Sequence, residues 1–235
     1  MYTIIGNGRL AQHFIYYFNA LDLPFNHWYR SAHTSLAECL AQSSHVLLLI
    51  SDKQIEPFII ENHKLLQKHH IIHCSGAHIS AFAYSAHPLM TFNAELYTLE
   101  EYHQVPFILE KEGLSFAELL PGLPNPHAYI PRSEKPYYHA ICVMANNFTT
   151  LLWQKFFSEF QERFHLPENI AMPLLTRTFQ NLQHDHQAAL TGPLIRNDLQ
   201  TIEKNLHALT EDDFYDVYRA FLKTAVSLQK EFEEK

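Results

Sequence analysis

The sequence predicts an α/β protein with a doubly wound, mainly parallel sheet followed by an all-α part. Short apolar runs alternate with helical patterns in the N-terminal half, which is typical of βαβ units. The stretch 121–136 holds five prolines and marks a domain boundary, and the pattern beyond Tyr137 is helical. We therefore expect a sheet domain over residues 1–131 and an all-helical domain over residues 132–235.

The first strand, expected over residues 2–5, ends in a glycine turn that opens a helix. The turn residues Gly6-Asn7-Gly8-Arg9-Leu10-Ala11 fit the G-x-G-x-x-A fingerprint of Rossmann dinucleotide-binding folds. In this motif Gly6 permits the tight turn and Gly8 leaves room for a pyrophosphate, which the free N–H groups of the helix would bind. A strand–turn–helix without a ligand is the alternative.

The second strand, expected over 24–29, indicates which nucleotide would bind. It ends at Arg30 and Ser31, about where an NAD site carries a carboxylate for the ribose hydroxyls. Arg30 offers positive charge, Ser31 offers a hydroxyl, and His33 is close in sequence, so these residues suit a 2′-phosphate. The sequence thus favours NADP over NAD, although Arg30 can also be an ordinary surface arginine.

The remaining strands place polar residues at the carboxyl end of the sheet. The apolar run 46–50 predicts a central strand buried on both faces, followed by Ser51 and Asp52. These two residues can cap the next helix or contribute to a ligand site at the strand ends. The segment 70–77 is expected to be the next strand plus its turn, and it holds Cys74, Ser75 and Gly76. Further elements are expected in this order: strands over 81–86 and 105–110, a short helix over 115–120, and a strand over 127–130.

The C-terminal part predicts four helices. A long, largely apolar helix is expected over 137–164, with Asn146 and Asn147 as buried amides facing a cleft. A second is expected over 168–190, broken or bent at Pro173. A third begins near Pro193 and reaches about residue 207, and the last covers 214–231.

Composition excludes several functional classes. A net charge of −8 argues against nucleic-acid binding through phosphate attraction, and no apolar run is long enough to cross a membrane. The three cysteines are scattered and residues 1–5 read as a strand, so we expect no disulfides, no signal peptide and a cytoplasmic location. The 17 histidines lack metal-site spacing, and we expect no metal.

Several short segments, spread in order over almost the whole chain, carry a family resemblance. They are Gly6–Arg9, Ser51-Asp52, His73–Ala77, His87–Phe92, Tyr138–Ala140, Asn146–Phe148 and Leu190–Pro193 with Arg196 and Asp198. Together they resemble a bacterial family of Rossmann-like proteins classed as oxidoreductases, which join an NADP-binding domain to a helical domain of unknown function. That family is related to ketopantoate reductase, pyrroline-5-carboxylate reductase and the 6-phosphogluconate dehydrogenase superfamily.

The resemblance implies a cleft between the domains, with the nicotinamide near Cys74–Gly76 and the substrate held by the helical domain. Relatives often place a lysine and an asparagine on the first long helix, where they bind and polarise the substrate oxygen. Asn147 fits the asparagine, but Val143 and His139 stand one and two turns earlier in place of the lysine. His139 can replace it as a proton donor, because imidazole titrates near neutrality.

Three further residues are candidate catalytic or substrate-binding groups. Arg196 can hold a carboxylate or phosphate as a two-point fork, and Asp198 can orient Arg196 or His139. His87 lies at the end of an expected strand, before Pro88. These residues also have a structural interpretation. Arg196 and Asp198 can form an ion pair at a helix start, and His87 can fix its own backbone before Pro88.

These expectations combine into one hypothesis and one rival. The hypothesis is a cytoplasmic NADP-dependent oxidoreductase that acts on a small oxo or imino compound, with Arg196 anchoring an anionic group of the substrate. By analogy it is a homodimer through the helical domain, whose helices are apolar over more than one face. The rival is a non-catalytic NADP-binding sensor or interaction protein, which the missing lysine favours.

Overall fold

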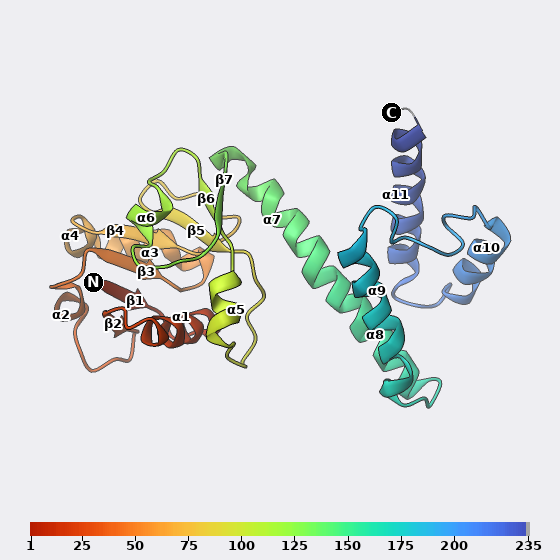
Figure 1. The fold of residues 1–235 in the computed structure, drawn as a ribbon, viewed down its shortest axis with the longest axis horizontal. Helices are drawn as coiled ribbons and strands as arrows, with labels where there is room; N and C mark the ends of the chain where they lie inside the picture. Colours follow the sequence, from red (N-terminus) through yellow and green to blue (C-terminus); the bar gives the residue numbers. More distant parts are fainter. Residues whose placement is uncertain (234–235) are drawn as a thin grey trace. The chain divides into compact units, whose positions relative to one another are not determined.

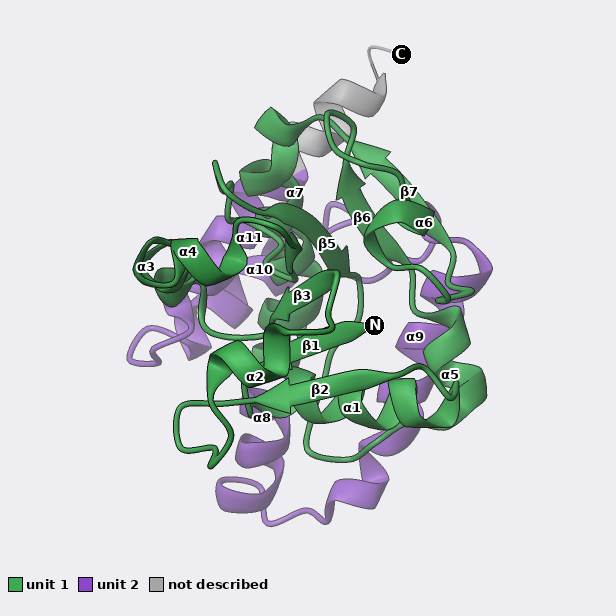
Figure 2. Cartoon of the chain, turned by 90° about the vertical axis from the view of Figure 1, so that its left-hand side faces the viewer, with its two compact units in different colours: residues 1–152 green, residues 153–235 purple. Residues whose placement is uncertain are grey.

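The computed structural model describes the backbone of residues 1–233 and the side chains of residues 1–225. The chain forms two compact units, residues 1–152 and residues 153–235, coloured green and purple in Figure 2. The expected domain boundary after residue 131 stays a prediction. The compact units divide after residue 152 because helix α7 (Lys135–Val143) packs within the sheet unit, where His87 and Gly76 contact it.

The first unit is built on a seven-stranded sheet in the order β2-β1-β3-β4-β5-β6-β7 (Figure 1). Strands β1 to β5 are mutually parallel, β6 runs antiparallel to β5, and β7 is parallel to β6. The strands are β1 Tyr2–Ile5, β2 Phe25–Trp28, β3 His45–Leu48, β4 His70–His73, β5 Tyr84–Pro88, β6 Phe107–Glu110 and β7 His127–Ile130. This mainly parallel, doubly wound sheet confirms the predicted fold class, and its strand order reverses between β1 and β3.

Both faces of the sheet are buried, because neighbouring residues of each central strand enter different apolar cores. Ile4 packs with α1 (Arg9–Ala20), α5 (Leu99–Gln104) and α6 (Phe116–Leu119). Ile5 packs with α2 (Leu36–Leu40), α3 (Asp52–Glu61) and α4 (His63–Leu66) on the opposite face. The near-continuous apolar runs that predicted central strands are therefore explained by this two-sided burial.

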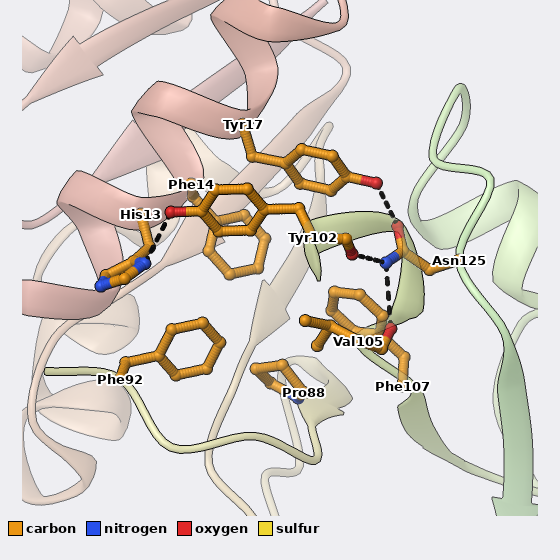
Figure 3. A pocket seen from close by; sticks show the side chains of 9 residues that line it. All are labelled: His13, Phe14, Tyr17, Pro88, Phe92, Tyr102, Val105, Phe107 and Asn125. Carbon is orange, nitrogen blue, oxygen red and sulfur yellow. Dashed lines mark hydrogen bonds between the residues drawn. The ribbon is translucent and has the colours of Figure 1, made fainter. Parts of the chain in front are cut away.

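Buried polar groups hold the core on the α1 face together (Figure 3). His13 Nδ1 lies 2.7 Å from the Tyr102 hydroxyl, and the hydroxyl of Tyr17 donates to Asn125 Oδ1 at 2.8 Å. Asn125 Nδ2 in turn donates to the carbonyls of Tyr102 and Val105, at 2.7 and 2.9 Å. These bonds fix α1 against α5 and the segment before β7, so the start of α1 is rigidly placed.

The remaining chain is helical, as predicted, with different boundaries. A single turn, η1 (Arg132–Glu134), precedes α7, which continues through a π-helical turn, η2 (Met144–Phe148), into α8 (Thr149–Glu162). The elements that follow are η3 Glu168–Ile170, α9 Met172–His184, α10 Leu199–Ala208 and α11 Tyr215–Glu233. Within the described backbone, no helix combines the length and apolar character needed to cross a membrane.

Two boundary predictions were wrong for identifiable reasons, whereas the predicted break at Pro173 is found. The turn η3 ends at Ile170 and α9 begins at Met172, so Pro173 occupies the first turn of α9, where its missing N–H costs nothing. That helix ends at His184, because Asp185 is extended, and does not reach residue 190. Pro193 does not open the third helix: residues 193–197 form turns, Asn197 has a φ of 51°, and α10 begins only after its cap, Asp198.

Candidate functional site

The two glycines of the first turn have different roles. Gly6 has a φ of 127°, its N–H donates to the Trp28 carbonyl at 2.9 Å, and a Cβ there would collide with the Leu49 carbonyl. The fold itself therefore requires Gly6. Gly8 is the N-cap of α1, no side chain caps that helix, and a Cβ at Gly8 would meet nothing within 4 Å. The start of α1 thus offers open space in which a phosphate can approach its N–H groups.

A pocket of about 650 Å³ begins at this turn, where the strand order reverses. It brings together Gly6, Asn7, Arg30 and Ser31, as the sequence predicts for a dinucleotide, while His33 is not among its lining residues. Further lining residues include the apolar Trp28, Leu36, Ile50 and Phe58. Arg9 is exposed and Leu10 packs on the core, and the contact of either residue with a cofactor stays a prediction. A nicotinamide dinucleotide fits this arrangement, which combines open space at Gly8, a helix start without a side-chain cap and a pocket that ends at Arg30.

The residues that follow β3 and β4 bond to one another. The Ser75 hydroxyl donates to Asp52 Oδ2 at 2.5 Å and accepts from the N–H of His78 at 3.0 Å. Ser51 is the N-cap of α3, but its side chain makes no capping bond. Cys74 is buried, and burial raises the pKa of its thiol to about 12, so it remains a protonated thiol at neutral pH. The contact of these residues with a cofactor stays a prediction.

A second pocket, of about 610 Å³, lies where α7 and η2 meet the end of β5, within the first compact unit. We call it the His139 pocket; its lining is His87, Leu89, Met90, Thr91, His139, Ile141, Cys142, Val143, Ala145, Asn146 and Asn147. Three predicted site residues, His87, His139 and Asn147, are therefore brought together although up to 60 positions separate them in sequence.

The two histidines of this pocket are held differently. His87 Nδ1 lies 2.8 Å from the Tyr138 hydroxyl, and its ring meets that of His139 edge to face at 5.7 Å between centroids. Burial, with smaller contributions from the charges of His139 and Lys135, lowers the pKa of His87 to about 4. The Nδ1 atom of His139 is buried without a hydrogen-bond partner. Because buried polar atoms are normally paired, this atom marks His139 as unusual.

Gly76 forms the surface against which both rings pack. A Cβ at Gly76 would overlap His139 Nδ1 and lie 3.1 Å from His87 Nε2. The segment expected beside a nicotinamide is therefore in direct contact with the two candidate catalytic histidines. This contact could not be read from the sequence, since it depends on how α7 packs on the sheet.

The sequence predicted that Asn146 and Asn147 are buried amides, and this prediction was wrong. Asn146 and Asn147 are both exposed, and they lie in the π-helical turn at the rim of the His139 pocket. A π turn widens the helix by one residue and is frequent at functional sites. Met144 and Phe148 of the same turn are exposed as well, so the apolar character of this helix did not by itself predict burial.

Sequence reasoning missed a buried lysine one helical turn before His139. Lys135 is 3% exposed, and its Nζ lies 3.2 Å from Oε1 of Glu110, which is 4% exposed. Arg132 Nε is 3.8 Å from the other oxygen of the same carboxylate. Burial lowers the pKa of Lys135, although Glu110 opposes this. The four-residue spacing of Lys135 and His139, which puts both on one helix face, was the signal available in the sequence.

Arg196 and Asp198 belong to the second compact unit. Asp198 caps α10, accepting from the Thr201 N–H at 3.1 Å and the Thr201 hydroxyl at 2.8 Å. These bonds, followed by the charge of Arg196, lower the pKa of its carboxyl group. The structural interpretation of Asp198 thus has direct support, and the catalytic or anchoring roles of both residues stay predictions. Over the described residues, no group of three or more potential ligands is arranged to hold a metal ion.

Comparison with known proteins agrees with the resemblance seen in the sequence. Residues 110–225 match the family described as a domain of unknown function, DUF2520. No curated protein matches the chain. The structure resembles protein BF3122 from Bacteroides fragilis, with a TM-score of 0.72, 18% identity, and coverage of 95% of this chain and 96% of that chain.

Two similar solved structures are reductases. One is the Plasmodium falciparum pyrroline carboxylate reductase with NADP bound, with a TM-score of 0.58, 11% identity, and coverage of 97% of this chain and 96% of that one. Another is an imine reductase from Bacillus cereus, with a TM-score of 0.61, 15% identity, and coverage of 100% of this chain and 99% of that one. At these identities the likeness shows the fold alone. The match over residues 110–225 and the shared fold are consistent with the Rossmann-like family that the sequence resembles.

Proposed function

We propose that this protein is an NADP-dependent oxidoreductase that acts on a small oxo or imino compound in the His139 pocket. The observation that carries the proposal is the pair of pockets on one sheet unit: one runs from the turn at Gly6 and Asn7 to Arg30, and the other contains His139. Gly76 lies against the histidines of the second pocket, at the carboxyl end of β4. In open α/β sheets this edge is the usual ligand-binding position.

The first pocket would hold the nucleotide through backbone and charge. The N–H groups at the start of α1 would bind the pyrophosphate, and Gly8 would let it approach. Arg30 and Ser31 would bind the 2′-phosphate that distinguishes NADP from NAD. NADPH, when bound, supplies the hydride that, with one proton, converts C=O to an alcohol or C=N to an amine, leaving NADP⁺.

The second pocket would orient and polarise the substrate. The side-chain amide of Asn147, two turns along the helix from His139, would hydrogen-bond a polar group of the substrate and so orient it. His139 would supply the proton, and Gly76 and His87 would hold its ring in place. The reductase folds among the similar structures, one of them a complex with NADP, support this assignment for the chain.

A binding titration tests the cofactor assignment. We expect NADPH to bind the full-length protein at least tenfold more tightly than NADH, and Arg30→Ala to remove most of that difference, because the 2′-phosphate loses its charged partner. Equal affinity for the two nucleotides would refute the NADP preference, and affinity for neither would refute the whole assignment.

A turnover assay tests the enzymatic part. NADPH oxidation would be followed against a panel of ketones, oxo acids and imines, with His139→Ala as the comparison. We expect turnover with at least one compound and a loss of about a hundredfold in the variant, the usual size of general acid catalysis. Tight NADPH binding without any turnover would instead support a non-catalytic NADP-binding protein.

Assembly and location remain part of the proposal. Apolar side chains on α7, η2 and α8 are exposed, including Tyr137 at 68% and Met144 at 58%, and a second copy of the chain would cover them. We infer a homodimer, to be tested by light scattering.

The three cysteines are free, in keeping with a cytoplasmic location.

A further inference from the structure

The His139 pocket has a markedly apolar wall. Leu89, Met90 and Ile141 line it and are 40%, 41% and 46% exposed, although each is a large apolar side chain. They come from two different segments, one after β5 and one on α7, yet they border the same hollow. Covering such side chains with an apolar group is favourable in proportion to the area removed from water.

The polar groups of the pocket are neutral or weakly basic. Thr91, Asn146 and Asn147 offer a hydroxyl and two amides, which do not ionise. His87 is uncharged at neutral pH, because burial lowers its pKa to about 4. Among the described residues that line the pocket, none is an arginine or lysine. A carboxylate bound there would lose water without gaining the permanent charge of an arginine or lysine, and the net charge of −8 on the protein adds to the penalty.

The size of the pocket suits a small organic molecule. Its volume of about 610 Å³ lies within the range of small-molecule sites, which typically combine an apolar wall with a few convergent polar groups. Here His139 and Asn147 are polar lining residues at different positions along the helix, and the wall is formed by Leu89, Met90 and Ile141.

We propose that the His139 pocket binds a ketone, aldehyde or imine that carries an apolar substituent and no carboxylate. This inference rests on the proposed function and narrows it, because the sequence left room for an anionic substrate held by Arg196. The reacting C=O or C=N group accepts a hydrogen bond from His139, and the substituent covers the apolar wall.

A matched pair of ligands tests the proposal. The affinity of each is measured by calorimetric titration of the full-length protein, once with saturating NADP⁺ and once without nucleotide. The pair is 4-phenyl-2-butanone and 2-oxo-4-phenylbutanoate, which share a phenylethyl ketone skeleton and differ by a methyl group against a carboxylate. We expect the ketone to bind at least tenfold more tightly. Equal affinity, tighter binding of the oxo acid, or binding of neither compound would overturn the proposal.

An arginine placed in the apolar wall tests whether the two ligands bind in the His139 pocket. Met90→Arg is expected to shift the affinity ratio at least tenfold toward the oxo acid, because it supplies the missing cation. Leu96→Arg is the control, since Leu96 is 44% exposed and does not line the pocket; it should leave the ratio unchanged. An unchanged ratio in Met90→Arg, or an equal shift in the control, would contradict binding in this pocket.

The proposed function is tested separately by NADPH titration of the same sample. If NADPH does not bind, the oxidoreductase assignment fails, while the ligand ratio measured without nucleotide still decides the pocket preference. If NADPH binds and the oxo acid is preferred, only the present inference fails.

Discussion

Gly76 and His139 are in such close contact that a Cβ atom at residue 76 would overlap Nδ1 of the His139 imidazole. The same atom would lie 3.1 Å from His87 Nε2. The loop after β4 therefore determines where both imidazoles lie, and the absence of a side chain at this one residue allows α7 to approach the sheet.

Gly76→Ala should displace His139 with little damage to the rest of the fold. We expect NADPH oxidation to fall at least tenfold and the free energy of unfolding to fall by about 1–3 kcal/mol, the usual cost of overpacking. Gly113→Ala is the matched control, since a Cβ there would lie at ordinary contact distances of 3.4 and 3.5 Å from its nearest neighbours. Steady-state kinetics and urea unfolding of both variants check this, and equal activity in the two would contradict the role of Gly76.

Gly8→Ala and Gly6→Ala should separate binding from folding. A Cβ at Gly8 has open space around it, so the variant should keep wild-type stability within about 0.5 kcal/mol while NADPH affinity falls at least tenfold. Gly6→Ala should lose stability by more than about 1 kcal/mol, because φ is 127° and the Leu49 carbonyl occupies the space. Urea unfolding and NADPH titration measure the two effects. Unchanged NADPH affinity in Gly8→Ala would show that no pyrophosphate binds at this turn.

Lys135→Met should be strongly destabilising, because it leaves the buried Glu110 carboxylate with only Arg132, at 3.8 Å, as a cationic partner. We expect a loss of about 3 kcal/mol in the free energy of unfolding. The double variant Lys135→Met/Glu110→Met should recover most of it, since no buried charge then remains.

An exposed ion pair is the control for this effect. Arg219 and Asp216 are 60% and 87% exposed, so Arg219→Ala should cost less than about 1 kcal/mol. Urea unfolding of the four proteins measures the comparison. A double variant as unstable as Lys135→Met would mean that lost packing, and not the uncompensated charge, causes the effect.

Acid should destabilise the protein through His73. The His73 ring is fully buried, and burial, with smaller contributions from Lys135, His78 and Arg132, lowers its pKa from 6.5 to about 3. Between these pH values the unfolded chain binds a proton that the folded chain does not, so the free energy of unfolding falls as the pH is lowered below about 6.5. The contribution down to about pH 4 is at most about 3 kcal/mol.

His73→Asn should reduce this pH dependence, while the exposed His33→Asn should leave it unchanged. Urea unfolding at a series of pH values gives the slope of the free energy of unfolding against pH. These slopes are compared, and not the free energies themselves, because the substitution also changes packing. His87 retains its own contribution of the same sign, so a residual slope is expected. A slope in His73→Asn equal to that of the wild type would contradict the assignment.

The sequence by itself determined the sheet unit and the glycine turn after β1, because these depend on local signals. The G-x-G-x-x-A turn after a β-rich run and the apolar run 46–50 required no knowledge of distant contacts. The strand over 127–130 was placed at its observed bounds for the same reason. Capping chemistry was also local: Ser115 and Glu118 form a complete capping box at α6, where a short helix was expected.

Only the tertiary structure decided the chemistry of the candidate site. The packing of α7 on the sheet placed His139 against Gly76, paired Lys135 with Glu110, and made Met90 and Ile141 walls of one pocket. Asn146 and Asn147 are exposed in the π turn, although their place inside an apolar helix had predicted buried amides. Periodicity tells which face of a helix is apolar, but which distant residues meet that face depends on how sheet and helix pack together, and no short stretch of sequence encodes that.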